Sequence, residues 1–460
     1  MKQTYARKEN VEEKGNNKDQ ASITNSLKSK TEAIKAGLLG LGTVGTGVYR
    51  IIEQHQEDLK HQTGCDIKVE KILIKSMDKE RSVAISPELL TTDYGDILND
   101  PNITIVIEVM GGIEEARTYI AKALQSKKNV ITANKDLIAL YGGELLTLAS
   151  ENGCDLFYEA SVAGGIPILR ALVEGFASDR ITKMIGILNG TTNYMLTRMA
   201  KEKLEYDFCL KQAQELGYAE ADPTSDVEGL DAARKLAILG TLGFHTDISL
   251  DEVKVKGISS VSQEDIQYGK ELGYEMKLLG IADRRDEEIE LSVQPTFVAK
   301  SHPLAHVNGV FNAVYVYGEA VGETMFYGPG AGELPTATAV VSDLVTVVKN
   351  LNLGVNGRGM VAPYREKKLK PENRIYRRYF IRLVVKDRSG MLADVTKAFA
   401  DHNMSISKMI QKPLAGQQAE LVTITHTISL KDLEAWVKNI ESNRSEIKIV
   451  SYYAVEGEEN

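Results

Sequence analysis

The sequence predicts an α/β protein that begins with a doubly wound parallel sheet, continues with an α+β unit, and ends with a small ferredoxin-like domain. Residues 34–39 form a short apolar stretch that runs directly into a glycine-rich turn and an amphipathic helical pattern. Apolar strand patterns then alternate with helical patterns up to about residue 154, which predicts a parallel sheet covered by helices. Residues 379–455 follow the order strand, helix, strand, strand, helix, strand, which is typical of ferredoxin-like domains.

The composition is that of a soluble globular protein with room for about two to four domains. The 460 residues are 43% hydrophobic and 26% charged, and the formal net charge of −9 argues against a nucleic-acid or anionic-membrane partner. No apolar run reaches the length of a membrane span, and the N-terminus carries no signal-peptide core. The cysteines Cys65, Cys154 and Cys209 are far apart and odd in number, which predicts reduced thiols and a cytoplasmic location.

The glycine-rich turn after the first strand predicts a bound dinucleotide. Glycines allow a tight turn and a close approach of the backbone to a pyrophosphate at the helix N-terminus. A strand, a glycine turn and a helix in this order are the context that the Rossmann-type fingerprint requires. The residues expected at the cofactor are Gly40, Leu41, Gly42, Thr43, Val44 and Gly45.

The loop after the second strand bears on the choice of cofactor. An NAD-dependent enzyme usually places an acidic residue here, on the ribose hydroxyls, whereas this chain has Lys75, Lys79 and Arg81. Basic groups suit a ribose phosphate, so NADP is favoured over NAD. The alternative is a solvated charged loop, because Asp78 and Glu80 lie among the basic residues.

Two later strands end in residues that should lie at the same edge of the sheet. The apolar run 103–110 ends at Gly111, and the run 129–133 leads to Lys135. Ligands of doubly wound sheets bind outside the carboxyl ends of the strands. We therefore expect Gly111 and Lys135 at the ligand site.

The stretch 213–235 carries the strongest chemical signal. A helix ends near Gly217, a turn rich in carboxylates follows, and a second apolar helix begins after Gly229. Asp231 and Lys235 stand four residues apart on that helix and therefore share one face. The alternative is an ordinary surface ion pair. A lysine at the end of a carboxylate-lined turn is nevertheless well placed to exchange a proton with a polar substrate.

The order of residues in this stretch is similar to the homoserine dehydrogenase signature. It reads Ala, three residues, Gly-Tyr-Ala, two residues, Asp-Pro, two residues, Asp-Val, one residue, Gly, one residue, Asp, three residues, Lys. The resemblance implies interconversion of L-homoserine and L-aspartate semialdehyde, with a nicotinamide cofactor, in threonine, methionine and isoleucine biosynthesis. It implies Lys235 as acid and base with Asp231 beside it. The substrate-binding residues it implies are Glu220, Tyr218, Thr191, Asp226 and Asp231.

The same resemblance implies further features of the site. In the family, a lysine matching Lys135 lies where cofactor and substrate meet, and a residue matching Gly332 touches the cofactor. The family also holds an alkali cation, Na⁺ or K⁺, in a loop of the second domain. The ligands this implies are the carboxylate of Glu159 and backbone carbonyls near Val162, Gly164 and Ile166, and such oxygens suit a hard cation.

The turn 387–392, which reads Asp-Arg-Ser-Gly-Met-Leu, resembles the ACT family of small-ligand sensor domains. ACT domains typically bind amino acids between paired copies, so the resemblance implies an effector, most plausibly L-threonine. The alternative is a domain that only strengthens oligomerisation. The family resemblance also implies a homodimer or homotetramer that pairs through the sheet of the second domain.

The expected domain organisation follows from these patterns and resemblances. The expected parts are a disordered tail (1–32), a dinucleotide-binding domain (33–154 and 328–352), an inserted substrate-binding and dimerisation domain (155–327), a linker (353–377) and an ACT regulatory domain (378–456). The sequence disfavours two rival functions. A thioester-forming semialdehyde dehydrogenase needs an activated cysteine, and neither Cys154 nor Cys209 has a catalytic signature nearby. A catalytically silent sensor is disfavoured by the intact stretch from Glu220 to Lys235.

Overall fold

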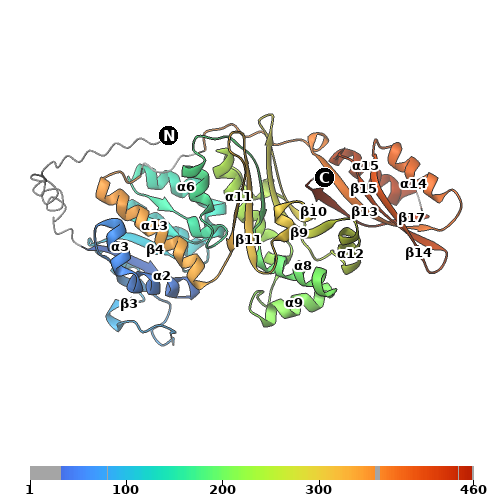
Figure 1. Ribbon diagram of the computed structural model, residues 1–460. Coiled ribbons are helices and arrows are strands. Elements are labelled where there is room, and N and C mark those ends of the chain that lie inside the picture. The colour runs from blue at the N-terminus through green and yellow to red at the C-terminus, as the bar shows by residue number, and fades with distance from the viewer. Residues whose placement is uncertain (1–32, 80, 358–362, 444, 458–460) are drawn as a thin grey trace, which may run out of the picture.

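The computed structural model describes residues 33–79, 81–357, 363–443 and 445–457 (Figure 1). The tail predicted over residues 1–32 lies outside these described residues. Three parts of the chain follow one another across Figure 1: the first domain with helix α13, the second domain in the middle, and the C-terminal domain at the opposite end. Within the described ranges no helix is both long and apolar enough to cross a membrane.

The first domain is built on a six-stranded parallel sheet in the order β3-β2-β1-β4-β5-β6. Its strands are β1 (Ile34–Leu39), β2 (Ile67–Leu73), β3 (Leu90–Thr91), β4 (Ile103–Glu108), β5 (Asn129–Thr132) and β6 (Leu156–Phe157). Its helices are α2 (Thr43–Gln54), α3 (Gln56–Thr63), α4 (Gly95–Leu98), α5 (Glu114–Gln125), α6 (Lys135–Glu151) and α13 (Glu333–Leu353). The strand order reverses between β1 and β4, which is where such sheets bind ligands. The predicted doubly wound sheet is confirmed.

Helix α13 returns to the first domain after the chain has built the second one, and it lies beside α2 in Figure 1. Its apolar face, including Ala337 and Val340, shares a hydrophobic core with Val48 and Ile52 of α2. The two helices approach closely at Gly47. A Cβ atom there would lie 2.8 Å from the carbonyl oxygen of Glu333 and 2.9 Å from Cβ of Ala337. The contact therefore requires glycine.

The second domain has an antiparallel sheet in the order β12-β11-β7-β9-β10. Its strands are β7 (Ile181–Ile187), β9 (Tyr274–Arg285), β10 (Glu288–Ala299), β11 (Phe311–Gly318) and β12 (Gly322–Pro329), with the short β8 (Lys254–Val255) beside β10. Its helices are α8 (Gly190–Glu202), α9 (Tyr206–Glu215), α10 (Thr224–Val227), α11 (Leu230–Phe244) and α12 (Gln263–Glu271). Helix α11 is buried along most of its length, because the sheet and the first domain cover it on different sides.

The C-terminal domain has the predicted βαββαβ order, and its antiparallel sheet runs β17-β13-β15-β14. Its elements are β13 (Tyr376–Lys386), α14 (Met391–Ala400), β14 (Ile406–Leu414), β15 (Gln418–Thr425), the short β16 (Ile428–Ser429), α15 (Leu430–Asn443) and β17 (Ile447–Glu456). Trp436 is fully buried under the sheet and packs against Phe399 with ring centroids 4.8 Å apart. This confirms the ferredoxin-like fold.

The second and C-terminal domains share one continuous eleven-stranded sheet, because β17 pairs in parallel with β10. Phe297 of β10 packs against Phe380 and Tyr453, with ring centroids 4.6 Å and 5.7 Å apart. The segment before β13 is also held to the second domain, since the amide of Lys370 donates to the carbonyl of Ile289 at 2.8 Å. The C-terminal domain is thus docked through a shared core.

The glycine contact between α2 and α13 gives a stability prediction. Gly47→Leu should lower the stability of the first domain by about 1–3 kcal/mol, because the added side chain has to separate two packed helices. Gly143→Ala is the control, since Gly143 is an exposed helical glycine with open space around its Cβ position and should gain about 0.5–1 kcal/mol. Thermal unfolding of both variants checks this. Equal melting temperatures would contradict the packing described here.

Candidate active site

Two charged side chains of helix α11 form the centre of the site. Gly229 precedes the helix in a left-handed conformation (φ 81°), and Asp231 and Lys235 lie on its first two turns. Both are buried, with 3% and 9% of their surfaces exposed. The ammonium of Lys235 donates to Oδ2 of Asp231 at 2.7 Å and to the carbonyl of Leu188, at the end of β7, at 2.8 Å. Asp231 and Lys235 therefore form a buried ion pair, and the alternative of a surface ion pair is wrong.

The other oxygen of Asp231 contacts the first domain. Nζ of Lys135, the first residue of α6, lies 2.5 Å from Oδ1 of Asp231. Arg234, three residues after Asp231 on α11, and Asp136, the residue after Lys135 on α6, form a second ion pair at 2.8 Å. Asp231 therefore bridges two lysines that belong to different domains, and the site lies where the domains meet.

The side chain of Asn189 organises the carboxylates. Its side-chain amide donates to Oδ1 of Asp226 at 2.7 Å and to Oδ2 of Asp231 at 2.9 Å. Its side-chain oxygen caps helix α8 by accepting from the amide of Thr192 at 2.9 Å. An asparagine between a strand and a Gly-Thr-Thr helix start is a recognisable N-cap signal. The contact with Asp226 and Asp231, in contrast, depends on tertiary structure.

The electrostatics of the cluster follow from these contacts. Burial alone would raise the pKa of Asp231, but the ammonium groups of Lys235 and Lys135 reverse this and hold its pKa well below the usual range. The effect of this carboxylate on stability is therefore present above about pH 4, its unfolded pKa, and is lost only as the pH falls further. Burial also lowers the pKa of Lys135, but the carboxylate of Asp231 outweighs this and raises it. Burial raises the pKa of Asp226.

The turn after α9 borders this cluster. The hydroxyl of Thr191 donates to the carbonyl of Tyr218 at 2.5 Å, and the Tyr218 ring, 43% exposed, meets that of Tyr194 edge to face. Glu220 is exposed, and its carboxylate makes no hydrogen bond or ion pair with another described residue. The structure thus brings Thr191 and Tyr218 together and leaves Glu220 free to bind a ligand.

The glycine turn has the shape that a dinucleotide needs. Gly40 has a φ of 101°, and a Cβ atom there would lie 2.8 Å from Cα of Met110. A Cβ atom at Gly45 would lie 2.2 Å from the carbonyl oxygen of Gly40. The space around Gly42, the residue before α2, is open, and no acidic residue lies in the first turn of the helix. Leu41, Thr43 and Val44 complete an exposed or half-buried rim that suits an anionic pyrophosphate.

The buried carboxylate of Glu108 supports the end of β4, and its only sign in the sequence is a charge that ends an apolar run. It accepts hydrogen bonds from the amides of Met110 and Gly111 at 2.9 Å and 3.3 Å and from the hydroxyl of Thr132 at 2.6 Å. Burial raises its pKa. Asn134 caps α6 and donates to the carbonyl of Gly112. These contacts fix the position of Gly111 and the start of α6, where Lys135 lies.

The basic loop after β2 is only partly free for a ligand. The guanidinium of Arg81 donates to the carbonyls of Ser76 and Lys79 at 2.7 Å and 2.8 Å, so this side chain holds the loop together. Lys75 is exposed two residues beyond Leu73, the strand end that accepts a hydrogen bond from Gly40. Of the predicted basic cluster, Lys75 is therefore the side chain best placed near the glycine turn.

The predicted cation loop is buried between the first and second domains. The carboxylate of Glu159 accepts one hydrogen bond on each oxygen, from the amides of Leu169 and Arg170, both at 2.8 Å. The carbonyl of Ile166 accepts from the amide of Ile168. The carbonyls of Val162 and Gly164 accept none from the described residues, although both residues are buried. Gly332, the residue before α13, has a φ of 121° and is exposed beside α2.

The cysteines have the wrong properties for nucleophilic catalysis. Cys154 and Cys209 are buried, and burial raises the pKa of each thiol to about 11. A catalytic thiol needs a lowered pKa and access to solvent. Neither Cys154 nor Cys209 therefore fits the nucleophile of a thioester-forming dehydrogenase.

Comparisons with known proteins agree with the geometry. Residues 167–345 match the homoserine dehydrogenase family, residues 40–159 match the homoserine dehydrogenase NAD-binding domain, and residues 379–444 match the ACT domain. A homoserine dehydrogenase of Bacillus subtilis is 55% identical over 428 residues, which cover 93% of this chain and 99% of that protein.

Solved structures give the same result. A homoserine dehydrogenase from Thiobacillus denitrificans superposes with a TM-score of 0.86 at 39% identity, covering 92% of this chain and 98% of that one. A hyperthermophilic archaeal homoserine dehydrogenase in complex with NADPH superposes with a TM-score of 0.59 at 26% identity, covering 69% of this chain and 98% of that one. The chain therefore belongs to the homoserine dehydrogenase family of NAD(P)-dependent oxidoreductases and carries an ACT domain at its C-terminus.

Proposed function

We propose that Lys235 is the proton-transfer group in the interconversion of L-homoserine and L-aspartate semialdehyde. An ammonium group has three N–H donors. Two of those of Lys235 are used by Asp231 and by the carbonyl of Leu188, so one remains for a substrate oxygen. This is the observation on which the proposal rests. The nicotinamide cofactor, when bound, exchanges the hydride with the carbon that bears this oxygen.

The charges around Lys235 fit a reduction of the aldehyde. As negative charge develops on the substrate oxygen, the ammonium of Lys235 donates its free proton and yields the alcohol; the lysine is then reprotonated from solvent. In the oxidation, the same group takes the proton back. Asp231 keeps Lys235 and Lys135 oriented toward the domain boundary. The side-chain amide of Asn189 donates to Asp231 and also to Asp226, which fixes the position of Asn189.

The substrate would lie against the turn after α9. Glu220 is exposed, with a carboxylate available for the substrate ammonium, and Asp231 is the second carboxylate that we propose there. Thr191 and Tyr218, which are hydrogen-bonded to each other, would line the same pocket, and Asp226 would support it. A charged, partly enclosed site of this kind suits an amino acid with one polar end and one reacting end.

Lys235→Met should lower kcat for homoserine oxidation by about 10²–10⁴-fold, the range for removing a general acid or base. The side chain keeps its length, so the Kd of the reduced cofactor, measured by its fluorescence, should change little. Lys211→Met, on an exposed face of α9, is the control and should keep its full activity. A folded Lys235→Met enzyme with nearly wild-type kcat would remove this residue from the mechanism.

NADP is proposed as the preferred cofactor. The support is the position of Lys75 just beyond the strand end that contacts the glycine turn, together with the NADPH bound to the archaeal relative. No carboxylate of a described residue is bonded to Lys75, which leaves its ammonium available for a phosphate.

Lys75→Ala should weaken NADP at least about tenfold and leave NAD almost unchanged, since a charge-assisted hydrogen bond contributes about 1.5–3 kcal/mol. Lys68→Ala is the matched control, because Lys68 is exposed at the other end of β2. Steady-state kcat/KM with both cofactors gives the comparison. Equal kcat/KM with NAD and NADP for the wild-type enzyme would show that the loop does not bind the ribose phosphate of NADP.

An alkali cation, Na⁺ or K⁺, is proposed in the loop formed by Glu159, Val162, Gly164 and Ile166. The carboxylate is buried, and the two carbonyls of Val162 and Gly164 lack a donor among the described residues. Unpaired buried carbonyls are unusual unless water or a cation satisfies them. The cation would brace the loop between the domains and takes no part in the chemistry.

Regulation by L-threonine and assembly into a homodimer or homotetramer are also proposed. The ACT domain supports the first, since such domains are commonly regulatory. The edge strand β12 supports the second, because its exposed Tyr327 stacks on the exposed Phe311 of the neighbouring β11, and an edge strand with exposed rings favours pairing with another copy. A cytoplasmic location is consistent with three cysteines that are all free thiols.

A further inference from the structure

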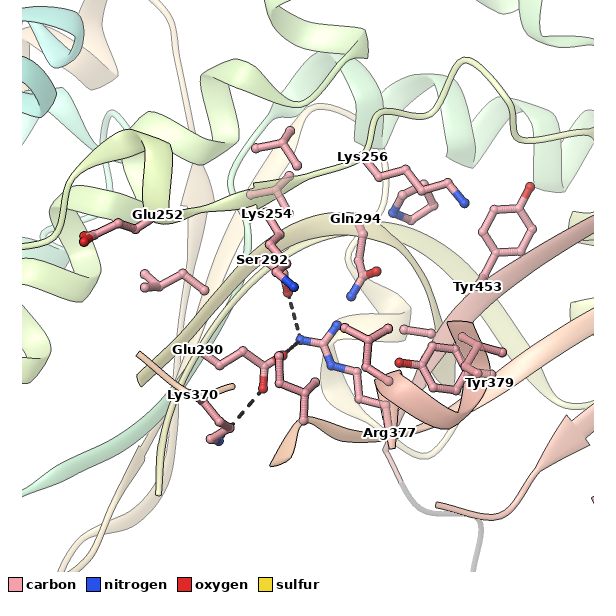
Figure 2. A pocket seen from close by; sticks show the side chains of 18 of the residues that line it. Glu252, Lys254, Lys256, Glu290, Ser292, Gln294, Lys370, Arg377, Tyr379 and Tyr453 are labelled. Carbon is pink, nitrogen blue, oxygen red and sulfur yellow. Dashed lines mark hydrogen bonds and ion pairs between the residues drawn. The ribbon is translucent and has the colours of Figure 1, made fainter. Parts of the chain in front are cut away.

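A cavity of about 300 Å³ separates the second domain from the ACT domain of the same chain (Figure 2). Strand β10 forms one wall, and β8, the start of β13 and the end of β17 form the others. None of its lining residues belongs to the active site described above. The volume lies at the lower end of the range of small-molecule sites, roughly 300–1,000 Å³, so a ligand there has to be small.

Three polar groups with unused hydrogen-bonding capacity point into this space. Tyr379 is only 4% exposed, yet its hydroxyl has no partner among the described residues. The side-chain amide of Gln294 also has none. One nitrogen of the Arg377 guanidinium is bonded to Glu290 and, at 2.8 Å, to Ser292, and the other N–H groups remain free. Figure 2 shows the Tyr379 hydroxyl and the Gln294 amide directed toward the Arg377 side chain.

An unpaired ammonium group lies at the edge of the cavity. Lys256 extends over the rings of Tyr452 and Tyr453, with its nitrogen 4.9 Å and 5.1 Å from their centroids. It donates to the carbonyl of Tyr452 at 3.3 Å but forms no ion pair with a described carboxylate. A cation held by aromatic faces and by a single carbonyl is available to an anion.

The other charges that line the cavity are compensated. Arg377 and Lys370 contact Glu290, and Lys370 is also paired with Asp283 at 3.0 Å. At the rim, Lys254 is paired with Glu372 at 2.6 Å and Glu252 with Lys367 at 2.8 Å. The cavity therefore carries one excess positive charge, which matches a ligand with one carboxylate.

Apolar side chains fill the rest of the lining. Leu291 and Val293 come from β10, Ile375 precedes β13, and Leu430 and Leu433 belong to α15. We infer that this cavity binds an aliphatic carboxylate of amino-acid size, with its carboxylate near Lys256, its polar substituents on Arg377, Tyr379 and Gln294, and its chain against the apolar wall. The same chemistry is shared by the aliphatic amino acids and by their keto acids.

The cavity also borders the start of the active-site helix. A Cβ atom at Gly229, the residue before α11, would lie 3.1 Å from Cγ1 of Val293 and 3.2 Å from Cγ1 of Val255, and both valines line the cavity. Asp231 follows two residues later. A ligand that moves β8 or β10 therefore shifts the support under the helix that carries Asp231 and Lys235. This link between the cavity and the active-site helix rests on the regulation proposed above. It places the effector site within one chain.

Binding is tested on the full-length enzyme with L-threonine, L-isoleucine and the keto acid of isoleucine as calorimetric probes. At least one should bind. Lys256→Gln should raise its Kd about tenfold or more, and Tyr379→Phe about three- to tenfold, as the loss of a charged and of a neutral hydrogen bond predicts. Lys431→Gln, on the exposed surface of α15, should leave the Kd unchanged. All three variants should keep the basal kcat.

Measuring how each probe inhibits homoserine oxidation distinguishes a failure of this cavity site from a failure of the proposed regulation by threonine. If threonine inhibits the wild type and both cavity variants equally, regulation stands and this site is wrong. If a probe binds in a manner that depends on Lys256 without changing kcat or KM, the binding site stands and its regulatory role is wrong. If none of the probes binds at millimolar concentration, or if the cavity variants behave like Lys431→Gln, the inference is overturned.

Discussion

The active site depends on the two ion pairs that the carboxylate of Asp231 forms. This carboxylate lies almost fully buried between the ammonium groups of Lys235 and Lys135, at 2.7 Å and 2.5 Å. Removing either lysine would leave a buried charge less compensated, and removing the carboxylate would place two ammonium groups face to face. Because Lys135 belongs to the first domain and Lys235 to the second, this one group both orients the lysine proposed for proton transfer and joins the two domains.

The fold brings the three charges together from two helices, α11 and α6. Helix α11 is buried by its own domain's sheet and keeps Asp231 and Lys235 on one face. Asn134 caps α6 and is itself tied to the carbonyl of Gly112, so the first residue of α6 has a fixed position. Helix α13, which follows the second domain in the sequence, packs on α2 and completes the first domain. The site is thus assembled from segments almost 300 residues apart in a single chain, roughly from Gly40 to Gly332.

Much of this could be predicted from the sequence, because it depends on local pattern. The glycine turn, the alternation of strands and helices, and the four-residue spacing of Asp231 and Lys235 are periodic or conformational signals. The family resemblance, confirmed by the comparisons, supplied the reaction. The burial of the Asp231–Lys235 pair could not be predicted, since the same spacing also suits a surface pair.

The remaining features are products of tertiary contact. Nothing in the sequence of β17 indicates that its edge pairs with β10 about 150 residues earlier, so the shared sheet and the cavity beside it could not be anticipated. From the sequence, Arg81 is expected to bind a phosphate. In the structure its guanidinium donates hydrogen bonds to carbonyls of its own loop. The sequence around Asn189 indicates a helix cap. Its hydrogen bonds to Asp226 and Asp231 depend on the packing of α10 and α11 against it, which the sequence does not show.

A double-mutant cycle of Lys135→Met and Asp231→Asn, measured as the free energy of unfolding at pH 7, tests the bridge between the domains most directly. If Asp231 joins the two domains, the two changes should be coupled by about 1–2 kcal/mol, within the range found for residues in direct contact. The Asp136→Asn and Arg234→Met cycle, on a more exposed pair, should give less than about 1 kcal/mol. Additive effects within about 0.3 kcal/mol for Lys135 and Asp231 would contradict the account.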